Sequence, residues 1–329
     1  MKMHFVCIAK RVAVNGVNSN QERKDDIMEY ILDNGQLRAV IKSFGAELKA
    51  LQDKATGQEY MWEADPKFWG KTSPVLFPFI GKLEGAGYRY GNTFYSIEKH
   101  GFARDMEFTV VSQGEASITF AIESDEATLK KFPFAFRLEL SYALEGKSLT
   151  ETWKVINNSG ESMYFSFGGH PAFACPLKKD AQSAGRTDCF IRLYGAEGAA
   201  LAAKELSSTD IGVPDGLLTG EQTKLELADG FLPVTEHIFD QDALCLERQG
   251  IAAVGLCDST KKEYVRLEAD CPVWGIWSVP DSNAGYICLE PWWGICDSKG
   301  YAGTLQERPY TNMAAAGQSC GAAFKITVH

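Results

Sequence analysis

The sequence predicts a single large domain built mainly of antiparallel β-strands, with few short helices. Apolar runs of strand length are separated by turn signals about every 8–12 residues, which is typical of a β-sandwich or barrel. In residues 137–146 and 149–156, apolar and polar residues mostly alternate, the period of a half-buried strand. No linker, repeat or change in composition divides residues 28–329, so one domain is expected there.

The first half of the chain has the pattern of consecutive hairpins. Residues 30–41 form two apolar-rich runs about Asn34-Gly35, a dipeptide favoured in two-residue hairpin turns. Residues 88–97 repeat this pattern about Gly91 and Asn92. Two longer segments continue the series of predicted strands and turns, at 108–123 and 136–167.

Helical signals are few, and the second half of the chain is again strand-like. Residues 124–132 combine an expected cap at Ser124 with early acidic residues, enough for about two turns. A second short helix is expected at 197–206, and the irregular stretch 196–241 is expected to hold long loops. The remaining predicted strands lie at 250–258, 263–269, 273–279, 285–294 and 324–328.

Composition and charge exclude several classes of function. The chain has 329 residues, of which 45% are hydrophobic and 23% charged, as expected of a soluble globular protein with a large core. A net charge of −10 disfavours nucleic acids and anionic membrane surfaces as partners, since both need a basic surface. No stretch approaches the roughly 20 apolar residues of a membrane span.

The cysteines and the first residues favour a cytoplasmic protein. The nine cysteines are odd in number and include no C-x-x-C pair, so we expect reduced, mostly buried thiols. Residues 1–27 are expected to be a polar N-terminal extension of the domain. Their apolar run "FVCIA" is too short for a signal peptide because Lys10 and Arg11 follow it at once.

His170 has the most distinctive surroundings of the five histidines. It lies in "FSFGGHPAF", with Gly168 and Gly169 before it and Pro171 after it. Glycines permit unusual backbone angles or close approach, and proline favours an extended conformation at the preceding residue. A histidine held at a strand end in this way suits proton transfer near neutral pH. The alternative is a histidine that only caps a turn.

Other candidates for a functional site close predicted strands or begin loops. Glu290 ends an apolar run in "YICLEPWWGICD", and burial beside Trp292 or Trp293 would raise its pKa as a general base requires. Tryptophan faces also stack on sugar rings. The alternative is a solvated strand-end glutamate. His100, Arg104, Lys82, Asp240 and Asp242 are polar loop residues that either bind a ligand or face water.

The sequence lacks the motifs of several kinds of catalytic or cofactor site. The histidines are too dispersed for a spacing-based metal signal, and no H-E-x-x-H motif occurs. There is no glycine-rich phosphate loop and no dinucleotide-binding fingerprint. The cysteines lack an evident base partner in sequence, which argues against a thiol nucleophile.

Four segments together resemble the aldose 1-epimerase (galactose mutarotase-like) family, and look closest to its LacX-like branch. They are "FPFIGKLEG", "HGFAR", "FSFGGHPAF" and "ICLEPWWGICD", in this order. The resemblance extends from about Met28 to the C-terminus. It implies a single β-supersandwich domain, a cytoplasmic location, no metal and no cofactor. The expected partner is a small-molecule aldose, possibly phosphorylated, and the expected assembly is a monomer or homodimer.

The resemblance also implies roles for particular residues. His170 matches the family's general acid and Glu290 its general base, while His100 matches a second histidine that binds sugar hydroxyls. The remaining expected sugar contacts include Lys82, in place of the family's usual arginine, which keeps the charge and loses the bidentate fork. They also include Asp242, preferred to Asp240, together with Arg104 and Trp293.

The implied function is interconversion of the α and β anomers of a hexose by acid–base opening and closure of the ring. Three alternatives remain. One is a hexose-6-phosphate 1-epimerase, and another is a non-catalytic sugar-binding protein of the same fold. The third is a glycoside hydrolase that uses Glu290 with Asp242, because such enzymes need two carboxylates. Four basic residues are candidates for a phosphate pocket in the first alternative: Lys71, Lys82, Arg89 and Arg104.

Overall fold

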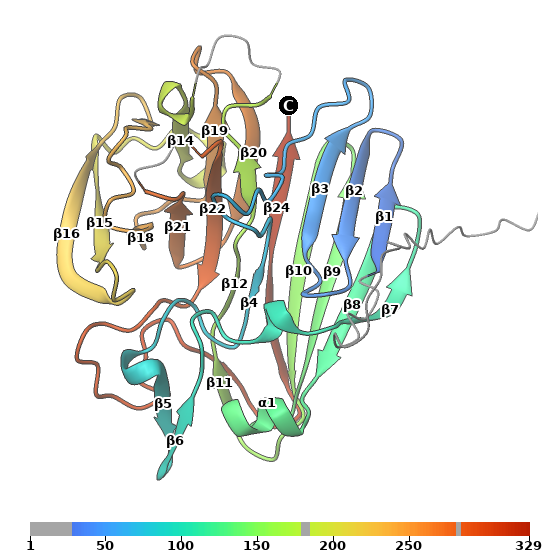
Figure 1. Cartoon of the computed structure of the whole chain (residues 1–329), viewed down its shortest axis with the longest axis vertical. Coiled ribbons are helices and arrows are strands. Elements are labelled where there is room, and N and C mark those ends of the chain that lie inside the picture. The colour runs from blue at the N-terminus through green and yellow to red at the C-terminus, as the bar shows by residue number, and fades with distance from the viewer. Residues whose placement is uncertain (1–27, 179–184, 281–283) are drawn as a thin grey trace, which may run out of the picture.

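The computed structural model describes residues 28–178, 185–280 and 284–329, so the predicted extension 1–27 lies outside the described residues. The described chain is mainly β, as predicted (Figure 1). Neighbouring strands in each sheet run antiparallel. No helix in this part of the chain is long and apolar enough to cross a membrane.

One layer is a nine-stranded sheet in the order β17-β14-β19-β20-β24-β10-β9-β8-β7. In its long central strands, buried residues alternate with half-buried or exposed ones, because one face packs on the core and the other lies toward water. Its strands are β7 (Thr109–Gln113), β8 (Ser117–Glu123), β9 (Phe136–Glu145), β10 (Ser148–Asn157), β14 (Phe190–Tyr194), β17 (Phe231–Pro233), β19 (Ala253–Cys257), β20 (Glu263–Ala269) and β24 (Ser319–Val328).

Two smaller sheets share one continuous hydrophobic core with the inner face of this layer. The first is the three-stranded sheet β1 (Glu29–Asp33), β2 (Leu37–Lys42) and β3 (Leu48–Asp53), on the right of Figure 1. The second has six strands in the order β18-β21-β22-β12-β4, with β13 also paired to β22. These are β4 (Val75–Leu76), β12 (Phe167–Gly169), β13 (Ala172–Ala174), β18 (Leu244–Glu247), β21 (Val273–Trp277) and β22 (Tyr286–Trp293).

Short two-stranded sheets and turns complete the described fold. Three two-stranded sheets pair β5 with β6, β11 with β23, and β15 with β16. Their bounds are β5 (Gly87–Tyr90), β6 (Thr93–Ser96), β11 (Met163–Phe165), β23 (Asn312–Ala314), β15 (Glu205–Ile211) and β16 (Leu218–Glu226). The helical elements are α1 (Glu126–Lys131) and the 3-10 turns Glu84–Ala86, Ala103–Asp105, Arg186–Asp188 and Ala196–Gly198.

Three local predictions are wrong. Helix α1 is capped by Asp125 and not by Ser124, because the Asp125 carboxylate accepts the backbone N–H of Thr128 at 2.7 Å. The helix predicted at 197–206 is absent, and the stretch expected to hold long loops contains the β15–β16 hairpin. Leu206 and Ile211 of β15 are buried, so this hairpin packs on the protein through its apolar side chains, which outweighs local helix propensity.

Candidate active site

A small cavity of about 180 Å³ lies against the face of β22 that points away from the main core. Strand β22 is buried on both faces, and alternate residues serve each side. Ile287, Leu289 and Trp293 belong to the main core, whereas Glu290 and Trp292 line the cavity. The lining residues are Trp69, Gly81, Lys99, His100, Arg104, His170, Ile211, Gly216, Asp242, Ala243, Trp277, Glu290, Trp292 and Cys296.

Glu290 is a carboxyl group held in the wall of this cavity. It is 1% exposed, and burial raises its pKa well above the ordinary value. The indole Nε1 of Trp292 donates a hydrogen bond to Oε2 of Glu290 at 3.1 Å. Gly275 of β21 pairs with Glu290, and a Cβ atom there would lie 2.4 Å from the Trp292 ring. The glycine therefore makes the space in which Trp292 reaches Glu290.

His170 follows β12 and lies next to Glu290 in the wall of the cavity. Its Nε2 lies 3.3 Å from Oε2 of Glu290, and burial lowers the pKa of the imidazole to about 3. A Cβ atom on Gly168 would lie 2.7 Å from the Pro291 carbonyl oxygen, and one on Gly169 2.7 Å from the Phe324 ring. These glycines are therefore needed for close packing between strands, which brings His170 up to β22.

A column of aromatic rings sets the orientation of the His170 imidazole. Trp69 stacks on His170 with ring centroids 4.9 Å apart and an interplanar angle of 28°. Tyr286 stacks on Trp69 and on Trp62, and Trp277 meets His170 edge-on at 83°. With its plane held by Trp69 and Trp277, His170 presents Nε2 to the carboxyl group.

His100 supplies a neutral hydrogen-bond donor. It adopts a left-handed conformation with φ of 70°, and its backbone N–H donates to the carbonyl of Gly81 at 2.8 Å. Its Nδ1 accepts the backbone N–H of Gly81 at 3.1 Å, so Nε2 carries the ring proton. Burial, followed by the nearby Lys99, lowers the pKa of His100 well below its ordinary value. The ring is therefore uncharged at neutral pH.

Charged side chains also line the cavity. Lys99 Nζ lies 3.6 Å from a carboxylate oxygen of Asp242, with the two side chains 47% and 23% exposed. Arg104 donates to the backbone carbonyl of Lys99 at 2.8 Å and pairs with Asp105 at 3.5 Å. Arg104 thus braces the loop that carries Lys99 and His100, as well as lining the cavity.

The structure brings together five of the seven predicted site residues: His100, Arg104, His170, Asp242 and Glu290. Lys82 does not line the cavity, and its side chain lies against Gly216. Trp293 faces the main core, where it stacks on Phe167, because neighbouring residues of a strand point to opposite faces. Trp292 occupies the position expected of Trp293.

Sequence reasoning missed other residues of the cavity. Lys99 directly precedes His100 in a loop, where no local pattern distinguishes it from a solvated lysine, and Trp277 lies within the predicted strand at 273–279. Trp69 lies in a loop with no local signal of function. Of the four basic residues considered for a phosphate pocket, Arg104 alone is at this cavity, whereas Lys71 pairs with Asp105 at 3.2 Å.

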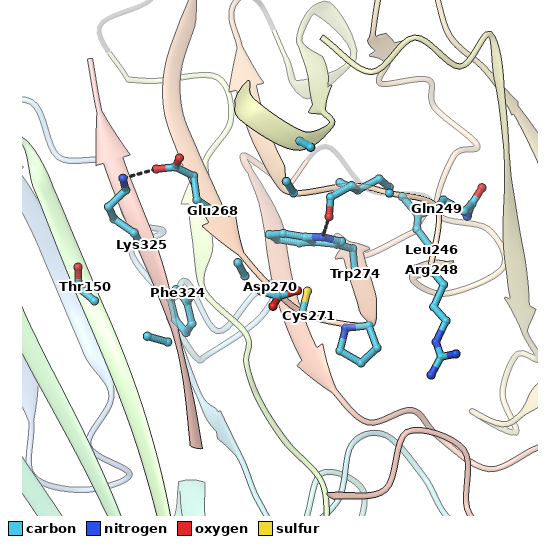
Figure 2. A pocket seen from close by; sticks show the side chains of 17 residues that line it. Thr150, Leu246, Arg248, Gln249, Glu268, Asp270, Cys271, Trp274, Phe324 and Lys325 are labelled. Atoms are coloured by element: carbon cyan, nitrogen blue, oxygen red, sulfur yellow. Dashed lines mark hydrogen bonds and ion pairs between the residues drawn. The ribbon is translucent and has the colours of Figure 1, made fainter. Parts of the chain in front are cut away.

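A second, larger hollow of about 960 Å³ shares no lining residue with this cavity (Figure 2). Two of its ionic groups pair with each other: Lys325 Nζ lies 2.6 Å from a carboxylate oxygen of Glu268. Trp274 lies near the centre of Figure 2, and its Nε1 donates a hydrogen bond to the carbonyl of Ile251 at 3.0 Å. The paired imidazole of His170 and carboxyl group of Glu290 lie in the smaller cavity, which is therefore the candidate active site.

Comparisons with known proteins give one matching family model and several similar proteins. The sequence model of the aldose 1-epimerase family matches residues 28–270. The chain is 30% identical to the chromosomal protein LacX of Lactococcus lactis subsp. lactis over 312 residues, which cover 92% of this chain and 99% of that protein.

Two solved structures have a similar fold. A galactose mutarotase related enzyme from Lactobacillus acidophilus superposes with a TM-score of 0.82 at 32% identity, covering 92% of this chain and 97% of that one. A galactose mutarotase-like protein from Lactobacillus casei superposes with a TM-score of 0.82 at 31% identity, covering 92% of this chain and 100% of that one.

Proposed function

The chain belongs to the aldose 1-epimerase family, and from this premise we propose that it interconverts the α and β anomers of a hexose. The observation that carries the proposal is the contact of 3.3 Å between His170 Nε2 and Glu290 Oε2. It lies in a cavity of about 180 Å³, smaller than the roughly 300–1,000 Å³ of pockets for larger ligands and suited to one sugar ring.

Ring opening needs a base that takes the proton of the C1 hydroxyl and an acid that protonates the ring oxygen. We assign Glu290 as the base and His170 as the acid. Both sugar oxygens are attached to C1, so the base and the acid must be neighbours, as these two side chains are. Rotation about the C1–C2 bond and closure with the two roles exchanged then give the other anomer.

One proton shared between the two groups is sufficient for this cycle. Burial favours the neutral form of each, raising the pKa of Glu290 and lowering that of His170, so the empty site holds the proton on the carboxyl group. Transfer of the proton to Nε2 across the 3.3 Å contact produces the imidazolium acid and the carboxylate base. The hydrogen bond from Trp292 stabilises that carboxylate.

The other residues of the cavity suit the binding and orientation of a sugar. His100 offers a donor for a hydroxyl, and Asp242 offers an acceptor beside Lys99. The half-buried rings of Trp69 and Trp277 provide apolar faces for the ring carbons. We propose contact roles for His100, Asp242 and Arg104 as predicted, and for Lys99 and Trp292 in place of Lys82 and Trp293.

Polarimetry on freshly dissolved α-galactose and α-glucose tests the proposal. We expect Glu290→Gln and His170→Ala each to lower the rate of anomerisation by about 10²–10⁴-fold, the usual worth of a general acid or base. Glu268→Gln, a carboxylate of the larger hollow, is the matched control and should retain the rate. If both active-site variants equilibrate the sugar as fast as wild type, the assignment is wrong.

The phosphorylated substrate remains a second candidate, because Lys99 and Arg104 bring two positive charges to the cavity. A hexose-6-phosphate epimerase would anomerise glucose 6-phosphate faster than glucose, and Lys99→Gln would remove that preference. Sugar binding without any rate enhancement would instead identify a non-catalytic binding protein, and release of reducing sugar from glycosides would identify a hydrolase.

We propose a cytoplasmic location, which is supported by the free thiols of all eight cysteines among the described residues. The proposed assembly is a monomer or homodimer.

A further inference from the structure

A buried cysteine lies next to the acid–base pair and has no part in the proposed reaction. Cys288 is two residues before Glu290 on β22, so both side chains point to the same face. Ala172 of β13 pairs with Cys288, and His170 lies two residues before Ala172. The pairing of β13 with β22 thus brings a thiol, an imidazole and a carboxyl group together from segments more than a hundred residues apart.

The spacing of these three groups is close to that of a tetrahedral metal site. One ligand atom from each of His170, Cys288 and Glu290 lies within 4.8 Å of the others, and all three residues are buried. Bonds of about 2.0–2.3 Å to zinc place neighbouring ligand atoms about 3.3–3.6 Å apart. The 3.3 Å between Nε2 and Oε2 already matches one edge, so the remaining adjustment is about 1 Å at the thiol.

We propose that His170, Cys288 and Glu290 bind a thiophilic divalent cation such as Zn²⁺, which acts as an inhibitor and not as a cofactor. A soft thiolate selects such ions over Mg²⁺ and Ca²⁺, which prefer oxygen ligands. The ion binds Nε2 of His170 and Oε2 of Glu290, the two atoms that exchange the proton, so it blocks anomerisation. This inhibitory part rests on the proposed function, whereas metal binding itself does not.

Charge balance favours the complex in this buried place. A thiolate and a carboxylate together cancel the double charge of the ion, and neutral His170 adds none. Binding displaces the Cys288 thiol proton to solvent, together with the proton of Glu290 where the carboxyl group holds one. Affinity should therefore rise steeply with pH.

Three protein ligands would leave one tetrahedral position of the ion to a water molecule from the cavity, which His170 and Glu290 line. His100 is the nearby histidine, but its Nδ1 accepts the Gly81 N–H and its Nε2 carries a proton, so it presents no lone pair. The ion enters through the same cavity as the sugar, because His170 and Glu290 both line it. Sugar and metal are therefore expected to compete.

Cadmium titration of the full-length protein tests the proposal directly. Protein treated with a chelator and then dialysed is titrated with Cd²⁺ at pH 8 under a phosphine reductant, and thiolate-to-cadmium absorption in the ultraviolet is recorded. We expect one Cd²⁺ per chain with a thiolate band, displaced by Zn²⁺ and unaffected by Mg²⁺. Cys288→Ser should lose the thiolate band, and its affinity for Cd²⁺ should fall at least about tenfold. Tenfold is the smallest loss usual for a residue that only supports a metal ligand, and Cys288 is proposed to be a ligand itself.

Cys296→Ser is the matched control, because Cys296 is also buried and lines the cavity but lies outside the cluster. It should keep the band and the affinity. A band that persists in Cys288→Ser, or wild-type protein without a saturable site, would overturn the proposal. If near-ultraviolet circular dichroism shows that Cys288→Ser is not folded, His170→Gln is titrated instead. This variant keeps the thiol and must lose affinity for Cd²⁺.

Inhibition is measured separately, as the change that Zn²⁺ causes in the rate of anomerisation of wild type and of each variant. Zn²⁺ should slow wild-type anomerisation, and saturating sugar should weaken that effect. A protein that binds Cd²⁺ through Cys288 without any anomerisation would retain the metal site and refute the proposed function. A protein that anomerises sugars but is indifferent to Zn²⁺ would refute the inhibitory part of the proposal and leave the proposed function intact.

Discussion

Gly275 controls the hydrogen bond that Trp292 gives to Glu290, and Gly275→Ala should weaken it. The added Cβ atom would lie 2.4 Å from Cζ2 of Trp292, where ordinary contact begins at 3.4 Å. The ring must therefore move by about 1 Å (3.4 − 2.4 Å), because the backbone of β21 is held by pairs with β18 and β22. Nε1 lies 3.1 Å from Oε2 of Glu290, and a shift of that size breaks or misaligns the bond.

The cost follows from the charge of the group that loses its donor. A hydrogen bond to a charged group contributes about 1.5–3 kcal/mol, and each 1.36 kcal/mol is tenfold in rate. We therefore expect kcat/KM to fall about 10- to 100-fold by polarimetry with freshly dissolved α-galactose. Because the Trp292 bond lowers the pKa of Glu290, its loss should also move the alkaline limb of the pH profile upward.

Two further variants separate this effect from general disruption. Trp292→Phe removes the donor without adding volume and should reproduce the loss of rate. Trp293→Phe is the matched control, since its Nε1 donates to the backbone of Asp270 on the core side of the same strand. If Gly275→Ala and Trp292→Phe both keep wild-type kcat/KM and an unchanged pH profile, the proposed role of this bond is refuted.

Three other predictions concern buried ionisable side chains. The pH profile of anomerisation should be flat near neutrality and fall on the acid side toward the pKa of His170 of about 3, and a limb near 6.5 in folded protein would contradict this. Burial raises the pKa of Glu151 to about 8, so its contribution to stability is complete below pH 4.5 and is lost as pH rises through 8. The stability of Glu151→Gln relative to wild type, measured by urea unfolding, should therefore increase over that window by at most about 1.4 kcal/mol per pH unit, and a constant difference would refute it. Asp297→Ala leaves the buried guanidinium of Arg308 without its two 2.8 Å bonds and should cost about 3–5 kcal/mol by urea unfolding, whereas a cost below about 1 kcal/mol would show that the pair is not needed.

Local patterns in the sequence were enough to predict most strands. The hairpin about Asn34 and Gly35 forms as β1 and β2, because that turn and the alternating residues beside it are properties of adjacent positions. The stretch 196–241 was harder, since the β15–β16 hairpin depends on the packing of Leu206 and Leu225 against the rest of the protein. Propensity alone favoured a helix there, and burial decided otherwise.

The sequence by itself determined the family resemblance and two candidate site residues: a histidine framed by glycines and proline, and a glutamate at the end of an apolar strand. Only the tertiary structure decided which groups meet. The period of β22 separates Trp292 from Trp293, but the strands on either side determine which of them faces the cavity. Likewise Lys99 reaches the site and Lys82 does not, because the loop that carries His100 is held against Gly81 by hydrogen bonds between residues 19 positions apart. Contacts over such separations depend on how the sheets pack, and no local pattern of residues encodes them.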